Sequence, residues 1–145
     1  MNGRDFLTLA QTLATSGTEA AWRSAISRAY YAAFHVAREL LEDLRFIVPR
    51  GDQAHAYLWL RLYNCGDPHV GRAGSELNQL RGERNRADYD LHRPISSAVA
   101  ASQVQAADRV IQILDATAAL TTRAQITDAM KIYERDVLKQ VTWKP

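Results

Sequence analysis

The sequence contains few of the residues that build covalent or metal-bound frameworks. Among its 145 residues there is one cysteine, Cys65, so neither an intrachain disulfide nor a thiolate zinc site can form within one subunit. The histidines are scattered along the chain without the spacing of metal ligands. They are His35, His55, His69 and His92. We therefore expect no metal ion and no cofactor, and the single thiol favours a reducing cytoplasm as the setting.

Long apolar runs and phosphate-binding loops are absent as well. No stretch reaches the roughly 18 apolar residues that a membrane span requires, and the first residues lack the apolar core of a secretory signal. Neither a glycine-rich phosphate loop nor a nucleophile elbow nor a paired-carboxylate motif occurs. We expect a protein without a membrane partner, whose chemistry depends on other residues.

Composition favours one globular domain over residues 1–145. With 47% hydrophobic and 23% charged residues, the chain can bury a core without covalent staples. The formal charge of +2 and the pI near 8.8 are mildly basic. Such a balance tolerates a polyanionic partner but falls short of the dense positive surface that indicates nucleic-acid binding by itself.

Apolar residues recur at three- and four-residue spacing in six segments, the period of an amphipathic helix. Ser16 and Glu19 have capping-box spacing, and either Ser96 or Ser97 can cap a later helix. The expected helices span about 5–15, 18–45, 54–63, 72–91, 96–120 and 122–141.

The helical spacing of apolar residues predicts that Leu91 points toward the core. It also predicts that the last helix includes Val137 and Val141. No strand-like alternation extends beyond a few residues, and there is no internal repeat. The sequence therefore predicts an all-α, up-and-down bundle of about five to six helices.

A cluster of polar groups ends the segment 72–91. Arg84 and Asp88 are four residues apart, Asn85 and Tyr89 repeat that spacing, and His92 follows. If the helix persists to His92, all five share a broad face, where a guanidinium can hold a phosphate beside a proton-carrying ring. The simpler interpretation is a surface ion pair worth a few tenths of a kcal/mol, with the tyrosine filling a groove.

A second polar face lies on the helix expected over 18–45. Its residues follow helical spacing opposite the apolar arc and combine aromatic with cationic side chains. They are Ser24, Arg28, Tyr31, His35 and Arg38. We expect Arg28, Tyr31 and His35, together with Arg86, to contact a substrate held by the first cluster.

Two blocks resemble the HEPN family, an all-α domain named for higher eukaryotes, prokaryotes and nucleotide binding. The block from Arg28 to Ala32 reads Arg-Ala-Tyr-Tyr-Ala, and the block from Arg84 to Tyr89 fits Arg-x-x-Ala-Asp-Tyr, both as in one prokaryotic branch. The resemblance covers about 5–120. It implies a homodimer that brings the two motif-bearing helices together across a twofold axis, with a cleft lined by both copies.

Many members of that family are metal-independent ribonucleases with an arginine, a polar residue and, after four to six intervening positions, a histidine. The resemblance places Arg84 and Asn85 on the first two, but Tyr89 stands where the shortest spacing has the histidine. An unperturbed tyrosine, with a pKa of about 10, is a poor base at neutral pH. Arg86 and His92 satisfy the spacing in a shifted register, so both registers stay open.

The sequence is therefore compatible with two functions. The first is a toxin-like or defence-associated endoribonuclease, in which Arg84 binds the phosphate, Asn85 orients it, Asp88 holds Arg84, and Tyr89 or His92 transfers the proton. The second is a non-catalytic module that binds a nucleotide or a partner nucleotidyltransferase. A cognate antitoxin is a further expected partner of the toxin-like form. In the branch that pairs with nucleotidyltransferases a second tyrosine follows the histidine by two places, whereas this chain has a leucine there.

Overall fold

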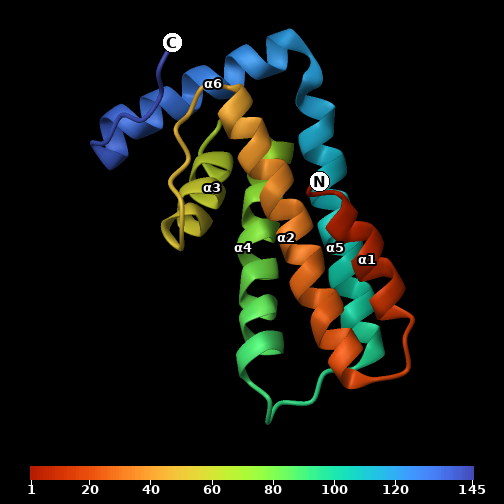
Figure 1. Ribbon diagram of the computed structural model, residues 1–145. Coiled ribbons are helices and arrows are strands. Elements are labelled where there is room, and N and C mark those ends of the chain that lie inside the picture. The colour runs from red at the N-terminus through yellow and green to blue at the C-terminus, as the bar shows by residue number, and fades with distance from the viewer.

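The computed structural model describes residues 1–145 and consists of helices and connecting loops, without strands (Figure 1). The prediction of an all-α protein is confirmed. No helix is both long enough and apolar enough to cross a bilayer. The α-helices are α1 (Asp5–Ala14), α2 (Glu19–Asp43), α3 (Gln53–Tyr63), α4 (Pro68–Tyr89), α5 (Ser97–Asp115) and α6 (Leu120–Tyr133). A 3-10 turn, η1 (Ala116–Ala118), and a π-helical turn, η2 (Glu134–Leu138), complete the chain.

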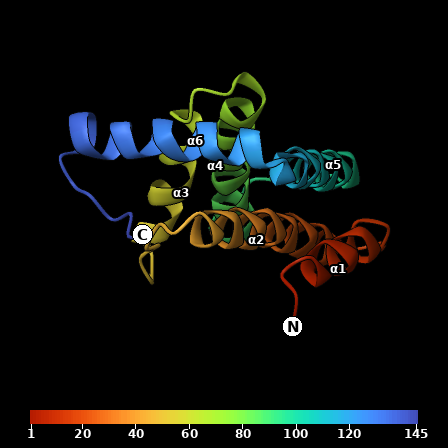
Figure 2. The same cartoon turned by 90° about the horizontal axis from the view of Figure 1, so that it is seen from above.

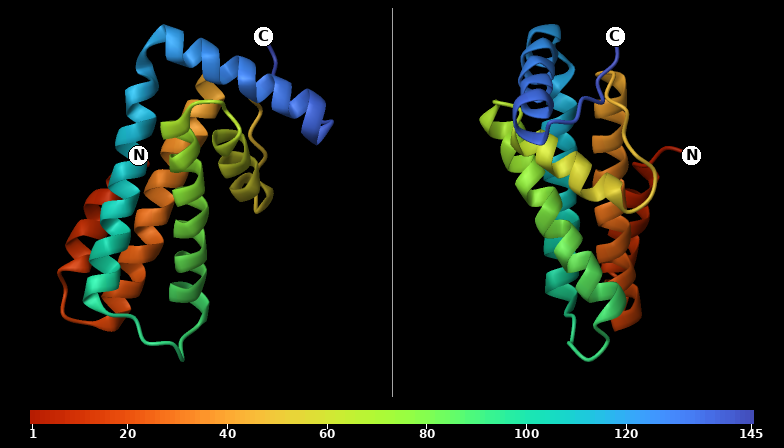
Figure 3. Two further views of the ribbon diagram at one scale, coloured as in Figure 1. Left: turned by 180° about the vertical axis from the view of Figure 1, so that it is seen from behind. Right: turned by 90° about the vertical axis from the view of Figure 1, so that its left-hand side faces the viewer.

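Helix α2 is the centre of the bundle. Helices α4 and α5 lie along it, and α1 packs against both α2 and α5 (Figures 1 and 3). Several alanines of α2 are fully buried, which lets the neighbouring helices approach closely. These are Ala25, Ala29, Ala32, Ala33 and Ala37. Helix α6 runs across one end of the long helices, so the up-and-down arrangement does not extend to it (Figure 2).

Side-chain caps begin α2 and α5, and only the cap of α5 was predicted correctly from the sequence. Ser96 caps α5 by accepting from the Val99 amide at 3.2 Å, as predicted. The cap of α2 is Thr18, which accepts from the Ala21 amide, and the capping box predicted from Ser16 is wrong. The Glu19 carboxylate accepts instead from the Ile95 amide at 2.6 Å. It therefore joins the start of α2 to the loop before α5.

The last segments differ most from the expected ranges. Ala119 is extended, with ψ of 131°, and separates α5 from α6. Lys139 is left-handed, with φ of 56°, and ends the helical chain before Val141. Leu91, which follows the end of α4, is 71% exposed. Val137 and Val141 are 65% and 68% exposed. The inward orientation predicted for Leu91 is therefore wrong, because the helical period does not continue to that position.

A buried arginine of α2 closes the C-terminal end of α4. The Nη1 atom of Arg23 donates to the carbonyls of Ala87 and Asp90, each at 3.0 Å, and to that of Arg86 at 3.4 Å. Its Nη2 atom donates to the carbonyl of Arg93. The last carbonyls of a helix have no partner within the helix, so this guanidinium supplies donors that the backbone lacks.

The C-terminal tail is held by a second buried ion pair. Glu134, which is fully buried, accepts from Arg61 Nε at 2.8 Å, from the Thr142 amide at 2.9 Å and from the Trp143 amide at 3.1 Å. The Trp143 indole donates to the carbonyl of Leu44 at 2.9 Å. The tail thereby packs on α3 and on the loop before it.

We expect Arg23→Met to destabilise the fold by about 2–4 kcal/mol, because it leaves the carbonyls of Ala87 and Arg93 without a donor. Urea unfolding followed by circular dichroism measures the change. Arg93→Met is the matched control, since the Arg93 side chain is exposed and its carbonyl is retained; it should cost less than about 0.5 kcal/mol. Equal unfolding free energies for the two variants would contradict the role of Arg23.

We expect Glu134→Gln to cost about 3–5 kcal/mol and to release the tail, since it leaves Arg61 buried without a charge partner. Burial alone would raise the pKa of Glu134, but hydrogen bonds from Thr142 and Arg61 lower it below 4.5. The carboxylate therefore stabilises the fold above the unfolded pKa, and this contribution is lost as the pH falls through the folded pKa.

The tail release is measured by Trp143 fluorescence and limited proteolysis, and the acid dependence by unfolding at several pH values. Glu42→Gln, at an exposed pair with Arg38 on α2, is the control and should leave the tail protected. A tail that stays protected in Glu134→Gln would show that other contacts hold it.

Candidate functional site

The two polar faces predicted from the sequence meet where α2 and α4 run antiparallel, beside the first turn of α3 (Figure 1). Here a set of charged and aromatic side chains surrounds Arg84, and we call it the Arg84 cluster. Its members are Ser27, Arg28, Tyr30, Tyr31, His55, Arg81, Arg84 and Asp88. The helices of a single subunit therefore bring together residues more than fifty positions apart.

Arg84 is buried against a contacting pair of phenol rings and makes no hydrogen bond. Only 8% of the residue is exposed, and its guanidinium carbon lies 5.5 Å from the ring centre of Tyr30 and 5.3 Å from that of Tyr31. Its Nε atom is buried without a partner, and the nearest carboxylate oxygen, on Asp88, is 3.8 Å from Nη1. Buried donors without acceptors are costly in a folded protein. The guanidinium thus has unused donors for an anion.

Asp88 is oriented by α2 more closely than by Arg84. Its Oδ2 atom accepts from the Ser27 hydroxyl at 3.1 Å, and Arg28 approaches the same hydroxyl at 3.5 Å. The Arg28 guanidinium also lies 5.4 Å from the Tyr31 ring centre and 5.0 Å from that of Phe6. Three of the expected residues, Arg28, Tyr31 and Asp88, are therefore arranged around Arg84.

A histidine from α3 completes the cluster. The Tyr30 hydroxyl is hydrogen-bonded to Nδ1 of His55, and both residues are buried. Burial lowers the pKa of His55 below 6.5, and the positive charges of Arg81 and Arg84 lower it further. Burial raises the pKa of Tyr30, against the opposing effect of the same two arginines. Both rings are therefore neutral at pH 7.

His35 lies at the margin of the Arg84 cluster, near the N-terminus. Its ring stacks on Phe6 with centres 5.8 Å apart and lies 6.4 Å from that of Tyr31. Burial, followed by the charges of Arg38 and Arg28, lowers the pKa of His35. The structure therefore places His35 on the same surface as Tyr31 but does not bring it to Arg84.

The other residues expected at the site lie apart from Arg84. Helix α4 ends at Tyr89, so the helix does not persist to His92, which lies in the following turn. Tyr89 is 77% exposed, and Asn85 is exposed as well. Arg86 pairs with Glu83 at 2.5 Å on the outer side of α4. The face that would have joined all five residues is therefore not formed within one subunit.

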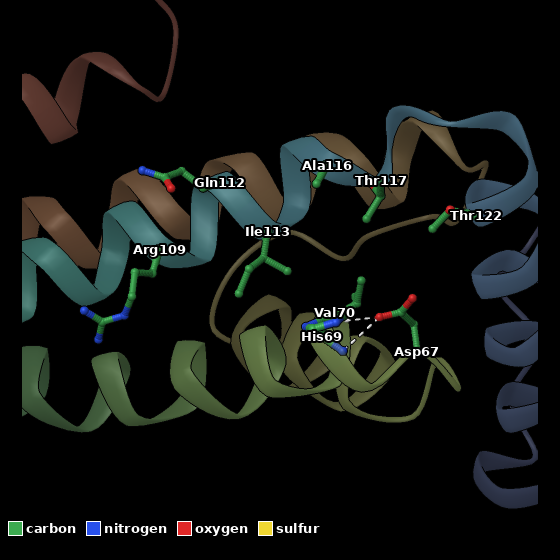
Figure 4. Close-up of a pocket in the computed structure, with 9 residues that line it drawn as sticks. All are labelled: Asp67, His69, Val70, Arg109, Gln112, Ile113, Ala116, Thr117 and Thr122. Carbon is green, nitrogen blue, oxygen red and sulfur yellow. Dashed lines mark hydrogen bonds between the residues drawn. The ribbon is translucent and has the colours of Figure 1, made fainter.

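A cavity lies elsewhere, at the opposite end of α4 (Figure 4). It has a volume of about 470 Å³ and opens between the start of α4, the end of α5 and the start of α6. Its Asp67 carboxylate already accepts from the amides of His69 and Val70 and so caps α4. No residue of the Arg84 cluster lines this cavity. No group of His, Cys, Asp or Glu is arranged to hold a metal ion.

Four members of the Arg84 cluster were not identified as site residues from the sequence: Ser27, Tyr30, His55 and Arg81. Tyr30 belongs to the apolar arc of α2, which is correct for its ring but does not reveal the bond of its hydroxyl. Arg81 precedes Arg84 by three positions on α4, and this spacing was a signal that could have been read. His55 comes from another helix, and no local pattern links it to Arg84.

Comparison with known families identifies the class of this bundle. The family model of the HEPN domain matches residues 2–117, from the start of the chain to the 3-10 turn after α5. The match covers well over half of the chain, so the chain belongs to the HEPN family. No curated protein and no solved structure matches it. Helix α6 and the tail lie outside the matched region.

We expect the pKa of His55, followed by the NMR shifts of its ring protons, to lie below 6.5, and to rise in Arg81→Met because one of the nearby positive charges is removed. Arg72→Met, an exposed position on the same helix, is the control and should leave the titration of His55 unchanged. A pKa of His55 at or above 6.5 in the unaltered protein would contradict the described environment.

Proposed function

We propose that this protein is a homodimeric, metal-independent endoribonuclease of the toxin or defence type that holds the scissile phosphate of RNA at Arg84. The observation that carries the proposal is a guanidinium packed against two neighbouring phenol rings with its donors unused. A planar fork of donors matches the oxygens of a phosphate. Membership in the HEPN family supports the same class of function.

Cleavage without a metal ion can use the substrate's own 2′-hydroxyl as the nucleophile. In this reaction charge develops on the phosphoryl oxygens, and donors fixed in advance stabilise it. Arg84 supplies those donors, Arg28 and Arg81 add positive potential, and Tyr31 offers a ring on which a base can stack. Asp88, held by Ser27, keeps a negative charge 3.8 Å from Arg84.

The dimer would complete the cleft around this surface. In the proposed arrangement α2 and α4 of both subunits face each other across a twofold axis, so each phosphate meets groups from both copies. The side chains of Asn85, Tyr89 and His92 are exposed in one subunit and form no hydrogen bond or ion pair with its own Arg84. They would therefore reach a bound RNA only across the dimer axis.

A second candidate function is a non-catalytic module. Tyr89 stands where the motif has a histidine, and it is exposed. In this alternative Arg84 binds the phosphate of a nucleotide, or fixes the register of an interface with a second copy, an antitoxin or a nucleotidyltransferase. Such a module would bind its ligand without changing it, and loss of Arg84 would abolish assembly rather than cleavage.

The deciding experiment incubates the protein with single-stranded RNA in the presence of EDTA and analyses the ends of the products. We expect 2′,3′-cyclic phosphate ends, and we expect Arg84→Ala to slow their formation about 100- to 1000-fold, the usual effect of removing a donor to a transition-state oxyanion. Arg72→Ala, an exposed arginine of the same helix, is the control for charge and should cleave at the normal rate.

Light scattering of the same samples records the oligomeric state. Cleavage that is unaffected in Arg84→Ala would exclude the Arg84 cluster as the site. Binding of RNA or nucleotide without any cleavage, with a monomeric Arg84→Ala, would establish the non-catalytic module instead.

A further inference from the structure

We propose that His55, oriented by Tyr30, is the group that takes the proton from the 2′-hydroxyl of an RNA whose phosphate is bound by Arg84. This inference rests on the proposed ribonuclease function and assigns its proton acceptor to α3, outside the motif helix. It makes Tyr30 a positioning residue, because Tyr30 would act through the imidazole and not on the substrate.

The first argument is proximity. The imidazole of His55 stacks on the ring of Tyr30 with centres 5.6 Å apart, and the guanidinium of Arg84 lies 5.5 Å from the centre of that same ring. Tyr31 is a second shared neighbour, 6.3 Å from the His55 ring and 5.3 Å from the guanidinium carbon. The cation and the imidazole are thus fixed against the same pair of rings within one subunit.

The second argument is the hydrogen bonding of the imidazole. Nδ1 of His55 is bonded to the Tyr30 hydroxyl, whereas Nε2 has no partner in the chain and is not among the fully buried atoms. When Nδ1–H donates to the phenol oxygen, the lone pair of Nε2 is free to accept a proton. A fixed ring with one engaged and one available nitrogen is the arrangement that a general base requires.

The third argument is charge. The titratable and charged groups that face His55 are Tyr30 and Tyr31 on α2, Arg81 and Arg84 on α4, and Asp52 just before α3. Burial and the two arginines lower its pKa, and Asp52 opposes them. The imidazole is therefore neutral and ready to accept a proton at pH 7. Once protonated beside two guanidinium groups, it is a stronger acid than usual and readily returns the proton.

The proposed step balances without a further reactant. Nε2 of His55 takes the proton from the 2′-hydroxyl, the bond from O2′ to phosphorus forms, and the bond from phosphorus to O5′ breaks. The electron pair of the broken bond stays on O5′, which receives the proton back from the imidazolium. The products are a 2′,3′-cyclic phosphate and a 5′-hydroxyl, and nothing is oxidised or reduced. If His55 on α3 accepts the proton, the reaction needs no histidine on α4, where Tyr89 stands at the motif position.

The test compares His55→Gln with the unaltered protein on a single-stranded oligoribonucleotide in EDTA. Glutamine keeps a polar side chain near Tyr30 but cannot accept the proton, so we expect the cleavage rate to fall about 100- to 10,000-fold. RNA affinity, measured by fluorescence anisotropy, should change less than about threefold, because Arg84 remains. The rate of the unaltered protein should fall in acid, at a pKa below 6.5, and His55→Gln should lack this limb.

A second variant, His55→Ala, is assayed with and without added imidazole, in case glutamine disturbs the packing. Free imidazole can enter the space left by the side chain and accept the proton in its place. Return of cleavage supports the proposal, and a folded His55→Ala protein that imidazole does not restore contradicts it. Tyr30→Phe should retain cleavage at a reduced rate and shift the acid limb, because it removes only the bond that orients Nδ1.

His92→Ala and Tyr89→Phe are the competing variants, and we expect both to keep the acid limb of the cleavage rate, whatever their effect on RNA binding, because that limb belongs to His55. Undiminished cleavage by His55→Gln, or its loss in His92→Ala alone, would overturn the role of His55 and leave the ribonuclease function standing. Absence of any cleavage by the unaltered protein would overturn both.

Discussion

The structure depends on the contact between α2 and α4 that encloses a guanidinium without giving it an acceptor. Fully buried alanines on α2, such as Ala33, let the helices approach closely. The buried Arg84 then packs against Tyr30 and Tyr31. Burying a cation in this way is unfavourable, and packing elsewhere has to offset it. Arg23 and Glu19, at the start of α2, supply part of that compensation by tying down the end of α4 and the loop beyond it.

The C-terminal segment, which lies outside the region matched by the HEPN family model, has a structural role that extends to the candidate site. Arg61 and Tyr57 of α3 are bonded to Glu134 and Thr142, respectively, so the C-terminal segment holds the middle and the last turn of α3. Because His55 lies in that first turn, its position beside Tyr30 depends on the placement of α3 as a whole. The acidic residue of the tail thus contributes indirectly to the geometry around Arg84.

The sequence predicted the helices and one half of the site because both depend on local spacing. Arg84 and Asp88 lie one helical turn apart, and the face with Arg28 and Tyr31 follows the period of a single helix. The end of α4 could not be predicted from spacing, since the donors that close it come from Arg23, more than sixty positions away. The placement of His55 depends likewise on the loop between α2 and α3, for which periodicity gives no information.

The position of the imidazole changes what the dimer has to provide in the proposed mechanism. A histidine on the motif helix, at the place of Tyr89, would be exposed at the end of α4 and could serve a phosphate only after assembly. His55 and Arg84 pack on the same two rings within one folded subunit, so the positions of the phosphate-binding cation and the proton acceptor are fixed before any partner arrives. Dimer formation would then contribute confinement of the RNA and exclusion of water, which strengthens the electrostatic contribution of Arg84 without changing the identity of the reacting groups.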